Sequence, residues 1–172
     1  MKVLYILNAT SRLSGSFKSF MIMLSGLMER GIEPILVLPK DTLQDYENLL
    51  RDKGFSVVVL VYKFHAWPHW QTWREKVLFF PRLVGRLFFN YLAEYLLARR
   101  FRDEDIAFIH TNVSVIGIGY RLSRRLGIPH IYHIREYGDK DFGICHFQSL
   151  LLIVHSDEAI IKYQCGICVM NL

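Results

Sequence analysis

A group of titratable side chains follows a short apolar run late in the chain. Residues 131–134 read as a buried strand, and His133, Arg135 and Glu136 stand at its end, before a polar loop at 137–141. Such groups at the end of a buried strand are typical of active sites in open α/β sheets. An imidazole beside a guanidinium suits a phosphate or a sugar hydroxyl better than a cation. Two plainer interpretations stay open: a core position for His133, and a structural ion pair between Arg135 and Glu136.

Two other polar segments follow apolar runs in the same way. His110, Thr111 and Asn112 come directly after the run at 106–109, and residues 8–16 follow the first apolar run of the chain. The carboxyl ends of parallel strands lie at one edge of a sheet, and ligands bind there. We therefore expect all three polar segments to meet at that edge.

The first of these segments leads into a predicted helix and suits an anion. Ser14, Gly15 and Ser16 stand at the start of that helix, whose free N–H groups favour negative charge. Gly15 allows a ligand to approach the backbone closely, and a simple capped turn is the plainer alternative. The segment has neither the Gly-x-Gly-x-x-Gly pattern of dinucleotide-binding proteins nor the Gly-x-x-x-x-Gly-Lys-Ser/Thr pattern of P-loop NTPases. Both classes are therefore disfavoured.

We expect no metal site in this chain. His130 and His133 are three residues apart on a predicted strand, so they point to opposite faces of the sheet. The C-x-x-C pair at 165–168 could form a zinc site with Cys145 and His146. We disfavour that site because the pair lies in an apolar C-terminal tail with no second knuckle. It also does not stand at a strand-to-helix turn, as a redox pair does. We take residues 164–172 as an ordinary tail.

The elements that hold these side chains alternate between strand and helix. Continuous apolar runs predict strands at residues 3–7, 33–38, 55–61, 106–109, 131–133 and 159–163. Apolar spacings of three and four predict four helices. The first runs from Ser14 or Ser16 to Gly31, and the second covers 41–53, with Asp41 as its cap and Gly54 at its end. The third covers 113–126 and ends before Gly127, and the fourth covers 147–154. This alternation predicts an α/β fold: a single-domain, Rossmann-like, doubly wound parallel sheet in three α/β/α layers.

The segment at 64–102 differs from the rest because it contains all three tryptophans and a long predicted helix. The helix starts near Trp73, and we expect it to bend at Pro81. The face expected to pack on the sheet carries Val77, Phe80, Val84, Phe88, Tyr91, Leu92 and Tyr95. The other face carries Phe79, Arg82, Arg86, Phe89, Leu97 and Arg100. Arginine interleaved with phenylalanine is typical of a segment at a membrane surface, so residues 67–102 are a candidate for such a segment. The alternative is a core helix with a solvated basic rim.

The composition is that of a folded domain with a basic surface. Of the 172 residues, 52% are hydrophobic and 22% charged, which allows a sizeable core. The net charge of +5 fits either an ordinary basic surface or an anionic partner such as a nucleotide diphosphate or membrane phosphate. We expect no nucleic acid among the partners. The chain has only three cysteines, and its first apolar run is too short for a signal peptide, so we expect a cytoplasmic protein. If residues 67–102 lie at a membrane surface, the protein is peripheral on the inner face of the cell membrane.

Three motifs carry a resemblance to a known family. They are MKVLYI at 1–6 with the turn and helix that follow it, IHTNVSVI at 109–116, and IPHIYHIRE at 128–136 with DFG at 141–143. With these motifs the chain resembles the N-terminal domain of family-4 retaining glycosyltransferases, which have the GT-B fold. The resemblance covers residues 1–143. Many relatives have two adjacent glycines where this chain has Ser14 and Gly15.

The resemblance implies a site for sugar transfer. In that family the N-terminal domain holds the acceptor, and a second Rossmann-like domain binds the nucleotide sugar. It implies that His133 is the catalytic residue and reaches the sugar undergoing transfer. The other implied roles are donor or anion binding by Ser14, Gly15, Ser16 and Arg135, and acceptor binding by His110, Thr111, Asn112 and Glu136. A nucleotide-diphosphate sugar is the donor substrate, and no further cofactor is expected.

We expect residues 1–163 to form this N-terminal domain and 164–172 to be a tail. We also expect the donor-binding domain to be absent. The chain would then be either a truncated product or a protein that works with a separate donor-domain chain. The chain is then the acceptor-side half of an enzyme that moves a sugar to a glycan or lipid-linked acceptor with retention, in cell-envelope polysaccharide synthesis, and is inactive alone. Two other functions stay open: a non-catalytic membrane- or glycan-binding module, and a small nucleotide-binding enzyme of another class.

Overall fold

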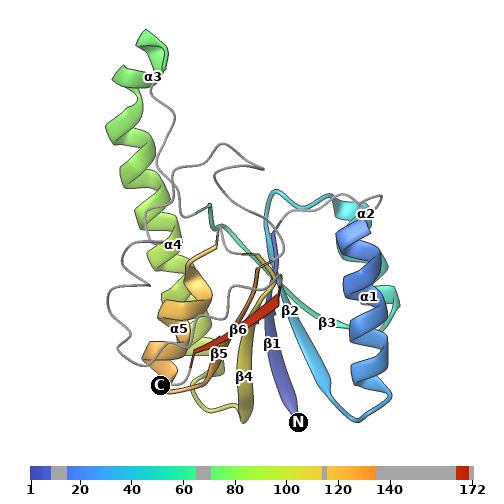
Figure 1. The fold of residues 1–172 in the computed structure, drawn as a ribbon. Coiled ribbons are helices and arrows are strands. Elements are labelled where there is room, and N and C mark those ends of the chain that lie inside the picture. Colours follow the sequence, from blue (N-terminus) through green and yellow to red (C-terminus); the bar gives the residue numbers. More distant parts are fainter. Residues whose placement is uncertain (9–14, 65–70, 114–115, 135–165, 171–172) are drawn as a thin grey trace.

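The computed structural model describes residues 1–8, 15–64, 71–113, 116–134 and 166–170. Within these residues the chain forms one sheet with helices on both of its faces (Figure 1). The sheet has six strands in the order β3-β2-β1-β4-β5-β6. The strands are β1 (Lys2–Ile6), β2 (Glu33–Pro39), β3 (Ser56–Leu60), β4 (Ile106–Thr111), β5 (His130–Ile134) and β6 (Gly166–Met170).

The first five strands are parallel, which confirms the predicted α/β sheet. Strand β6 runs antiparallel to β5 at the edge. It lies within residues 164–172, so the expectation of a plain tail there is corrected: this segment supplies an edge strand. The pairing gives hydrogen-bond partners to the side of β5 that β4 leaves open. The strand expected at 159–163 and the helix expected at 147–154 lie outside the described residues.

The helices cover the two faces of the sheet in three layers, as predicted. They are α1 (Gly15–Met28), α2 (Gln44–Asp52), α3 (Trp73–Val77), α4 (Phe79–Phe101) and α5 (Ile118–Leu126). Helices α1 and α2 pack on one face, where Phe20, Leu24 and Leu50 are fully buried. Helices α4 and α5 pack on the other face, where Leu97 and Leu122 are fully buried. Each apolar strand therefore has a core on both sides.

Three glycines end helices where the sequence predicted it. Gly31, Gly54 and Gly127 have φ values of 77°, 83° and 69°, a region that L side chains rarely adopt. The predicted cap at Asp41 is wrong. Helix α2 begins after Leu43, with no side-chain cap, because the chain first turns back through a hydrogen bond from the N–H of Thr42 to the carbonyl of Pro39 (2.9 Å). Asp41 instead pairs with Lys63.

Helix α5 is shorter than predicted and begins at Ile118. The expected start at 113 is wrong because the strand continues further. Thr111 still pairs with Tyr132 of β5, and the N–H of Asn112 donates to the carbonyl of Ile6 (3.1 Å). These bonds carry the extended backbone beyond the predicted strand end at 109, and the helix begins only at Ile118.

The long helix predicted from Trp73 is divided at Leu78, three residues before the bend expected at Pro81. A capping box starts α3: the hydroxyl of Thr72 accepts from the N–H of Glu75, whose carboxylate accepts from the N–H of Thr72. Pro81 then falls in the first turn of α4. Proline is tolerated there because its missing N–H has no intrahelical partner in that turn.

The face of α4 that packs on the sheet is opposite to the one expected. The predicted face, from Val77 to Tyr95, is exposed. The buried side chains are Asn90, Ala93, Glu94, Leu97, Ala98 and Phe101. Other elements satisfy the two polar ones: Asn90 accepts from the N–H of Lys63 (2.8 Å), and Glu94 accepts from Arg121 (2.9 Å). Among the described residues, no helix is both long and apolar enough to cross a membrane.

Candidate functional site

The carboxyl edge of the parallel sheet brings two predicted site residues together. Tyr5, His110 and Ile131 are neighbours in register across β1, β4 and β5. Because side chains alternate along a strand, His133 lies on the same face as Ile131 and one step closer to the edge. The rings of His110 and His133 meet nearly at right angles, with 5.7 Å between their centroids.

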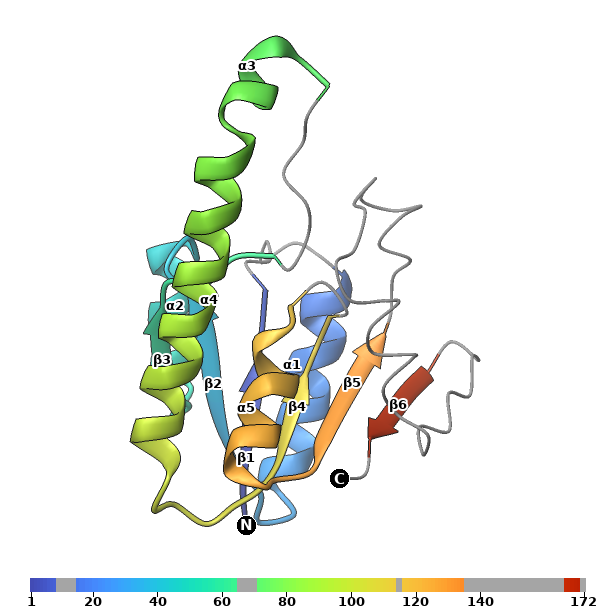
Figure 2. The ribbon, with the colours of Figure 1, turned by 90° about the vertical axis from the view of Figure 1, so that its left-hand side faces the viewer.

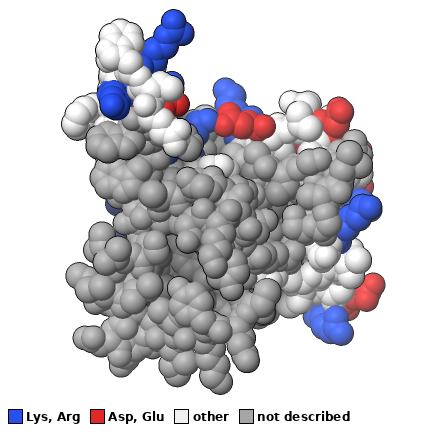
Figure 3. All heavy atoms as spheres, turned by 45° about the horizontal axis from the view of Figure 1, so that its top comes forward, with Lys and Arg blue, Asp and Glu red and all other residues white. Residues whose placement is uncertain are grey.

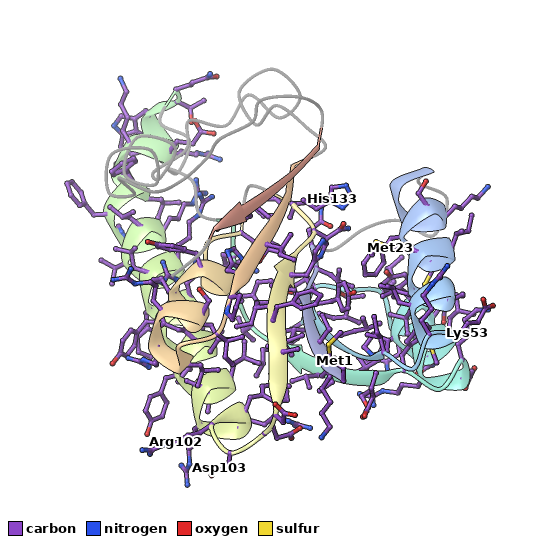
Figure 4. The ribbon with its side chains drawn as sticks, turned by 60° about the horizontal axis from the view of Figure 1, so that its bottom comes forward. Met1, Met23, Lys53, Arg102, Asp103 and His133 are labelled. Atoms are coloured by element: carbon purple, nitrogen blue, oxygen red, sulfur yellow. The ribbon has the colours of Figure 1, made fainter. Side chains whose placement is uncertain are left out.

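These two histidines continue a row of aromatic rings that starts on helix α1. The ring of Phe20 lies 5.7 Å from that of Tyr5, and Tyr5 lies 5.0 Å from His110. Figure 4 shows His133 at the far end of β5, on the side of the sheet that faces α1 and its Met23. His110 is buried and His133 is half-buried, so the row ends in a partly accessible imidazole. Burial raises the pKa of Tyr5 to about 12, so its phenol is neutral.

A half-buried imidazole held against buried rings suits hydroxyl chemistry. The packing of His133 against His110 restricts its ring orientation and leaves the ring half-buried. Imidazole can donate or accept a hydrogen bond and can take a proton from a bound hydroxyl. The sequence did not indicate Tyr5 and Phe20 as parts of the site. Their strand and helix positions read only as core, and the shared face became clear from the register.

Thr111, predicted as an acceptor-binding residue, lies on the opposite face of the sheet from His110. Its hydroxyl is fully buried and lies 2.8 Å from Nε2 of His130. Burial, and after it the nearby His110, lower the pKa of His130 to about 3. The contacts of His130 and His133 confirm that these two rings face opposite sides of the sheet. In the described part of the chain, no group of three or more His, Cys, Asp or Glu residues could hold a metal ion.

Gly119 makes room for this buried pair. A Cβ atom at that position would lie 2.1 Å from Oγ1 of Thr111 and 2.9 Å from Nε2 of His130. Helix α5 can therefore lie directly over the end of β4 only because residue 119 has no side chain.

Asn112 stands at the end of β4, next to the end of β1. It is buried, and its Oδ1 has no hydrogen-bond partner among the residues that the structure describes. The same holds for Oδ1 of Asn8, which follows β1. Two carboxamide oxygens thus stand after neighbouring strands at the carboxyl edge. A buried oxygen of this kind is costly unless a donor reaches it.

The carboxyl ends of β1 and β2 are joined by Tyr62. Its hydroxyl lies within hydrogen-bond distance of the carbonyl oxygens of Leu7 and Val37, the latter at 3.0 Å. Burial holds the pKa of Tyr62 well above its usual value. The neutral hydroxyl therefore fixes the chain where β1 passes into the polar segment before α1.

The remaining predicted site residues are placed only in part. Gly15 and Ser16 form the first turn of α1, whose N-terminus lies at the carboxyl edge of the sheet (Figure 1). Ser14, Arg135 and Glu136 lie outside the described residues. The described geometry thus brings together His110, His133 and the start of α1 at one edge, and it turns Thr111 away from them.

Sequence comparison finds no match among protein families or curated proteins. Structural comparison finds the crystal structure of MurG from Acinetobacter baumannii, with a TM-score of 0.54 and 15% sequence identity. The likeness covers 78% of this chain but only 35% of MurG. MurG is a GT-B glycosyltransferase of family 28.

At this identity the likeness to MurG shows a shared fold and no more. The chain has a Rossmann-like α/β architecture that is consistent with half of a GT-B fold. Because MurG belongs to family 28, the likeness supports the glycosyltransferase-like fold and does not extend to the predicted family 4.

Proposed function

We propose that this chain is the acceptor-side half of a glycosyltransferase. The observation that carries the proposal is the contact between His110 and His133 at the carboxyl edge of a GT-B-like half fold. In open α/β sheets that edge is where ligands bind. A donor nucleotide sugar and a glycan or lipid-linked acceptor would meet there, on the side of the sheet that α1 covers.

The residue roles in the proposal follow the order of the row of rings. His133, the more accessible imidazole, contacts the reacting sugar, and His110 holds it in place and lines the acceptor side. The N-terminus of α1 at Gly15 and Ser16 faces the donor diphosphate, since free N–H groups and the helix dipole favour an anion. Ser14 and Arg135 would add donor contacts.

Asn112 supplies an acceptor contact in this scheme, because its buried Oδ1 can accept from a sugar hydroxyl. Glu136 is proposed on the same side. Thr111 contributes indirectly, by holding His130 and the end of β4. Retention of configuration, membership of family 4 and a role in cell-envelope polysaccharide synthesis rest on the sequence motifs alone.

A nucleotide-binding half completes the proposed enzyme and comes from a separate chain or domain. The chain spans 35% of MurG, and stabilising a leaving diphosphate needs donors on both sides of it. A lipid-linked acceptor would place the reaction at the cytoplasmic face of a membrane.

Acceptor binding by this chain alone tests the proposal. Saturation-transfer NMR against polyprenyl-phosphate-linked sugars and soluble glycans should show contact to sugar protons for at least one acceptor class. His133→Ala should weaken that binding about tenfold or more, the loss expected for one buried hydrogen bond to a ligand. Lys53→Ala, an exposed change between α2 and the amino end of β3, is the matched control and should bind normally. Equal binding by both variants would contradict the proposal.

A non-catalytic glycan- or membrane-binding module is the second candidate, favoured by the exposed apolar face of α4. A transfer assay with labelled nucleotide sugar, run with a co-purified donor-half protein, separates the two functions. Turnover that His133→Ala abolishes supports the enzyme. Acceptor binding without turnover in the presence of that partner supports the module.

A further inference from the structure

Asn112 stands at the carboxyl edge on the face of the sheet that α1 covers. Alternation along the chain sets this face: His110 contacts Tyr5 on the side of α1, and Val113 belongs to the core under α4 and α5. Asn112 lies between them in the chain, so it shares the face of His110 and is one step closer to the edge. The backbone is still extended here, because the N–H of Asn112 donates to the carbonyl of Ile6 (3.1 Å).

The register of the sheet places His133 beside Asn112. Thr111 pairs with Tyr132 in the parallel ladder of β4 and β5, which Figure 2 shows side by side. The next residue of each strand, Asn112 and His133, therefore lie level with each other. Neighbouring strands are about 4.8 Å apart, and both side chains point to the face that α1 covers. A carboxamide and an imidazole thus stand next to each other at the carboxyl edge.

The carboxamide of Asn112 lacks a donor for its oxygen. The residue has 6% of its surface exposed, and among the described residues its Oδ1 is buried without a hydrogen-bond partner. Asn90 shows the ordinary case, because it is equally buried and its Oδ1 accepts from the N–H of Lys63 (2.8 Å). An unpaired buried oxygen lowers stability, and such groups persist mainly at functional sites or where water reaches them. The position of Asn112 therefore suits a ligand that donates a hydrogen bond.

The last row of side chains on this face combines an apolar residue, a carboxamide and an imidazole. Ile6 pairs with Thr111, so Leu7, which is buried on the same face, is level with Asn112 and His133. Figure 3, seen from the carboxyl-edge end, shows charged side chains of the described residues at the margins of this end. A phosphate would bring its oxygens to the lone pairs of Oδ1 with no proton between them. A hydroxyl supplies that proton, so the row suits a polyol better than an anion.

We infer that Asn112 and His133 together bind two adjacent hydroxyl groups of an acceptor saccharide. Vicinal hydroxyls lie side by side on a sugar ring, so one donates to Oδ1 of Asn112 while the other reaches the imidazole of His133. The inference rests on the proposed function and narrows its acceptor to a saccharide with a free vicinal diol, as opposed to a bare lipid phosphate. Such an acceptor already carries a sugar from an earlier transfer reaction. A site built to accept from a hydroxyl rejects an analogue without it, so Asn112 sets the acceptor specificity.

Saturation-transfer NMR of the full chain with defined probes tests this inference. The probes are the methyl glycosides of glucose, galactose and mannose, the monodeoxy analogues of each, and farnesyl phosphate. At least one glycoside should bind, and one of its deoxy analogues should bind about tenfold more weakly, the loss expected for one hydrogen bond. Asn112→Leu should bind that glycoside and that analogue equally, because the oxygen that distinguishes them is gone.

The outcomes of this experiment separate the inference from the proposed function. If Asn112→Leu still distinguishes the two ligands, or if farnesyl phosphate displaces the glycoside, the inference is overturned. The proposed function stands in either case when His133→Ala weakens the binding of the glycoside. If no glycoside binds to the native chain, the inference is overturned, and the proposed function then depends on the larger acceptors of its own test.

The unpaired oxygen gives a second test that needs no ligand. Leucine has the same branching as asparagine, so Asn112→Leu removes the unpaired group and should keep or raise the urea concentration at the unfolding midpoint. Asn90→Leu is the matched control, because it leaves the N–H of Lys63 without its partner and should shift the unfolding equilibrium about tenfold towards the unfolded state. Equal destabilisation by the two changes would overturn the inference, since Oδ1 of Asn112 would then be satisfied within the fold.

Discussion

Oγ1 of Thr111 and Nε2 of His130 lie 2.8 Å apart in the core between the sheet and helix α5. The pair joins the last residue of β4 to the first residue of the adjacent strand β5. Both side chains are essentially inaccessible to solvent. A buried polar pair of this kind is tolerated because each partner satisfies the other, and it places the neighbouring residues of both strands in a fixed register.

Gly119→Ala should destabilise the protein. The added methyl would collide with Thr111 and His130, and forcing extra volume into a packed core costs about 1–3 kcal/mol. Urea unfolding followed by circular dichroism measures the loss. The control is Gly85→Ala in α4, where nothing lies within 4 Å of the added atom. Alanine should stabilise that helix by about 0.5–1 kcal/mol. Similar effects of the two changes would contradict the close approach at Gly119.

The buried His130 should make stability fall in acid. In the unfolded chain its imidazole has a pKa near 6.5, and in the folded protein burial lowers it to about 3. Between these values only the unfolded state binds the proton, so lowering the pH from about 6.5 towards 3 favours unfolding, by up to about 1.4 kcal/mol per pH unit. Above the unfolded pKa the contribution of His130 is constant.

Urea unfolding at a series of pH values checks this. His130→Gln should be less stable at neutral pH and should show a smaller loss between pH values of about 6.5 and 3, by the share of one titrating group. An unchanged pH profile in the variant would show that other groups cause the acid sensitivity.

Glu94→Ala should loosen the contact between α4 and α5. The carboxylate is buried against Arg121 and Arg125, and removing one partner of a buried ion pair costs about 2–4 kcal/mol when the other side is partly solvated. The exposed pair of Lys63 and Asp41 gives the matched control, because Lys63→Ala should cost less than about 1 kcal/mol. A double-mutant cycle of Glu94 with Arg121 isolates the pair from packing effects.

Tyr62→Phe should destabilise the protein by about 1–2 kcal/mol, because the carbonyl oxygens of Leu7 and Val37 lose a buried donor. Tyr95→Phe removes an exposed hydroxyl and should change the free energy of unfolding by less than about 0.5 kcal/mol. Thermal unfolding of both variants gives the comparison. Equal stability of Tyr62→Phe and the native chain would mean that this hydroxyl does not hold the ends of β1 and β2.

The sequence by itself determined the parallel strands, the glycines that end the helices and the opposite orientation of His130 and His133. These features are local: apolar runs mark strands with a core on both faces, φ above zero favours glycine, and side chains alternate along a strand. It also predicted that the polar segments after the strands meet, because parallel strands share a carboxyl edge. The register then brought His110 and His133 into contact and turned Thr111 away.

Only the tertiary structure decided which face of α4 is buried. Both faces of that helix are largely apolar, so periodicity alone could not choose between them. The buried face includes Asn90 and Glu94, which look like surface residues until Lys63 and Arg121 satisfy them from other elements. Hydrogen-bond partners distant in the sequence make that burial possible, and the face predicted to pack, from Val77 to Tyr95, stays exposed.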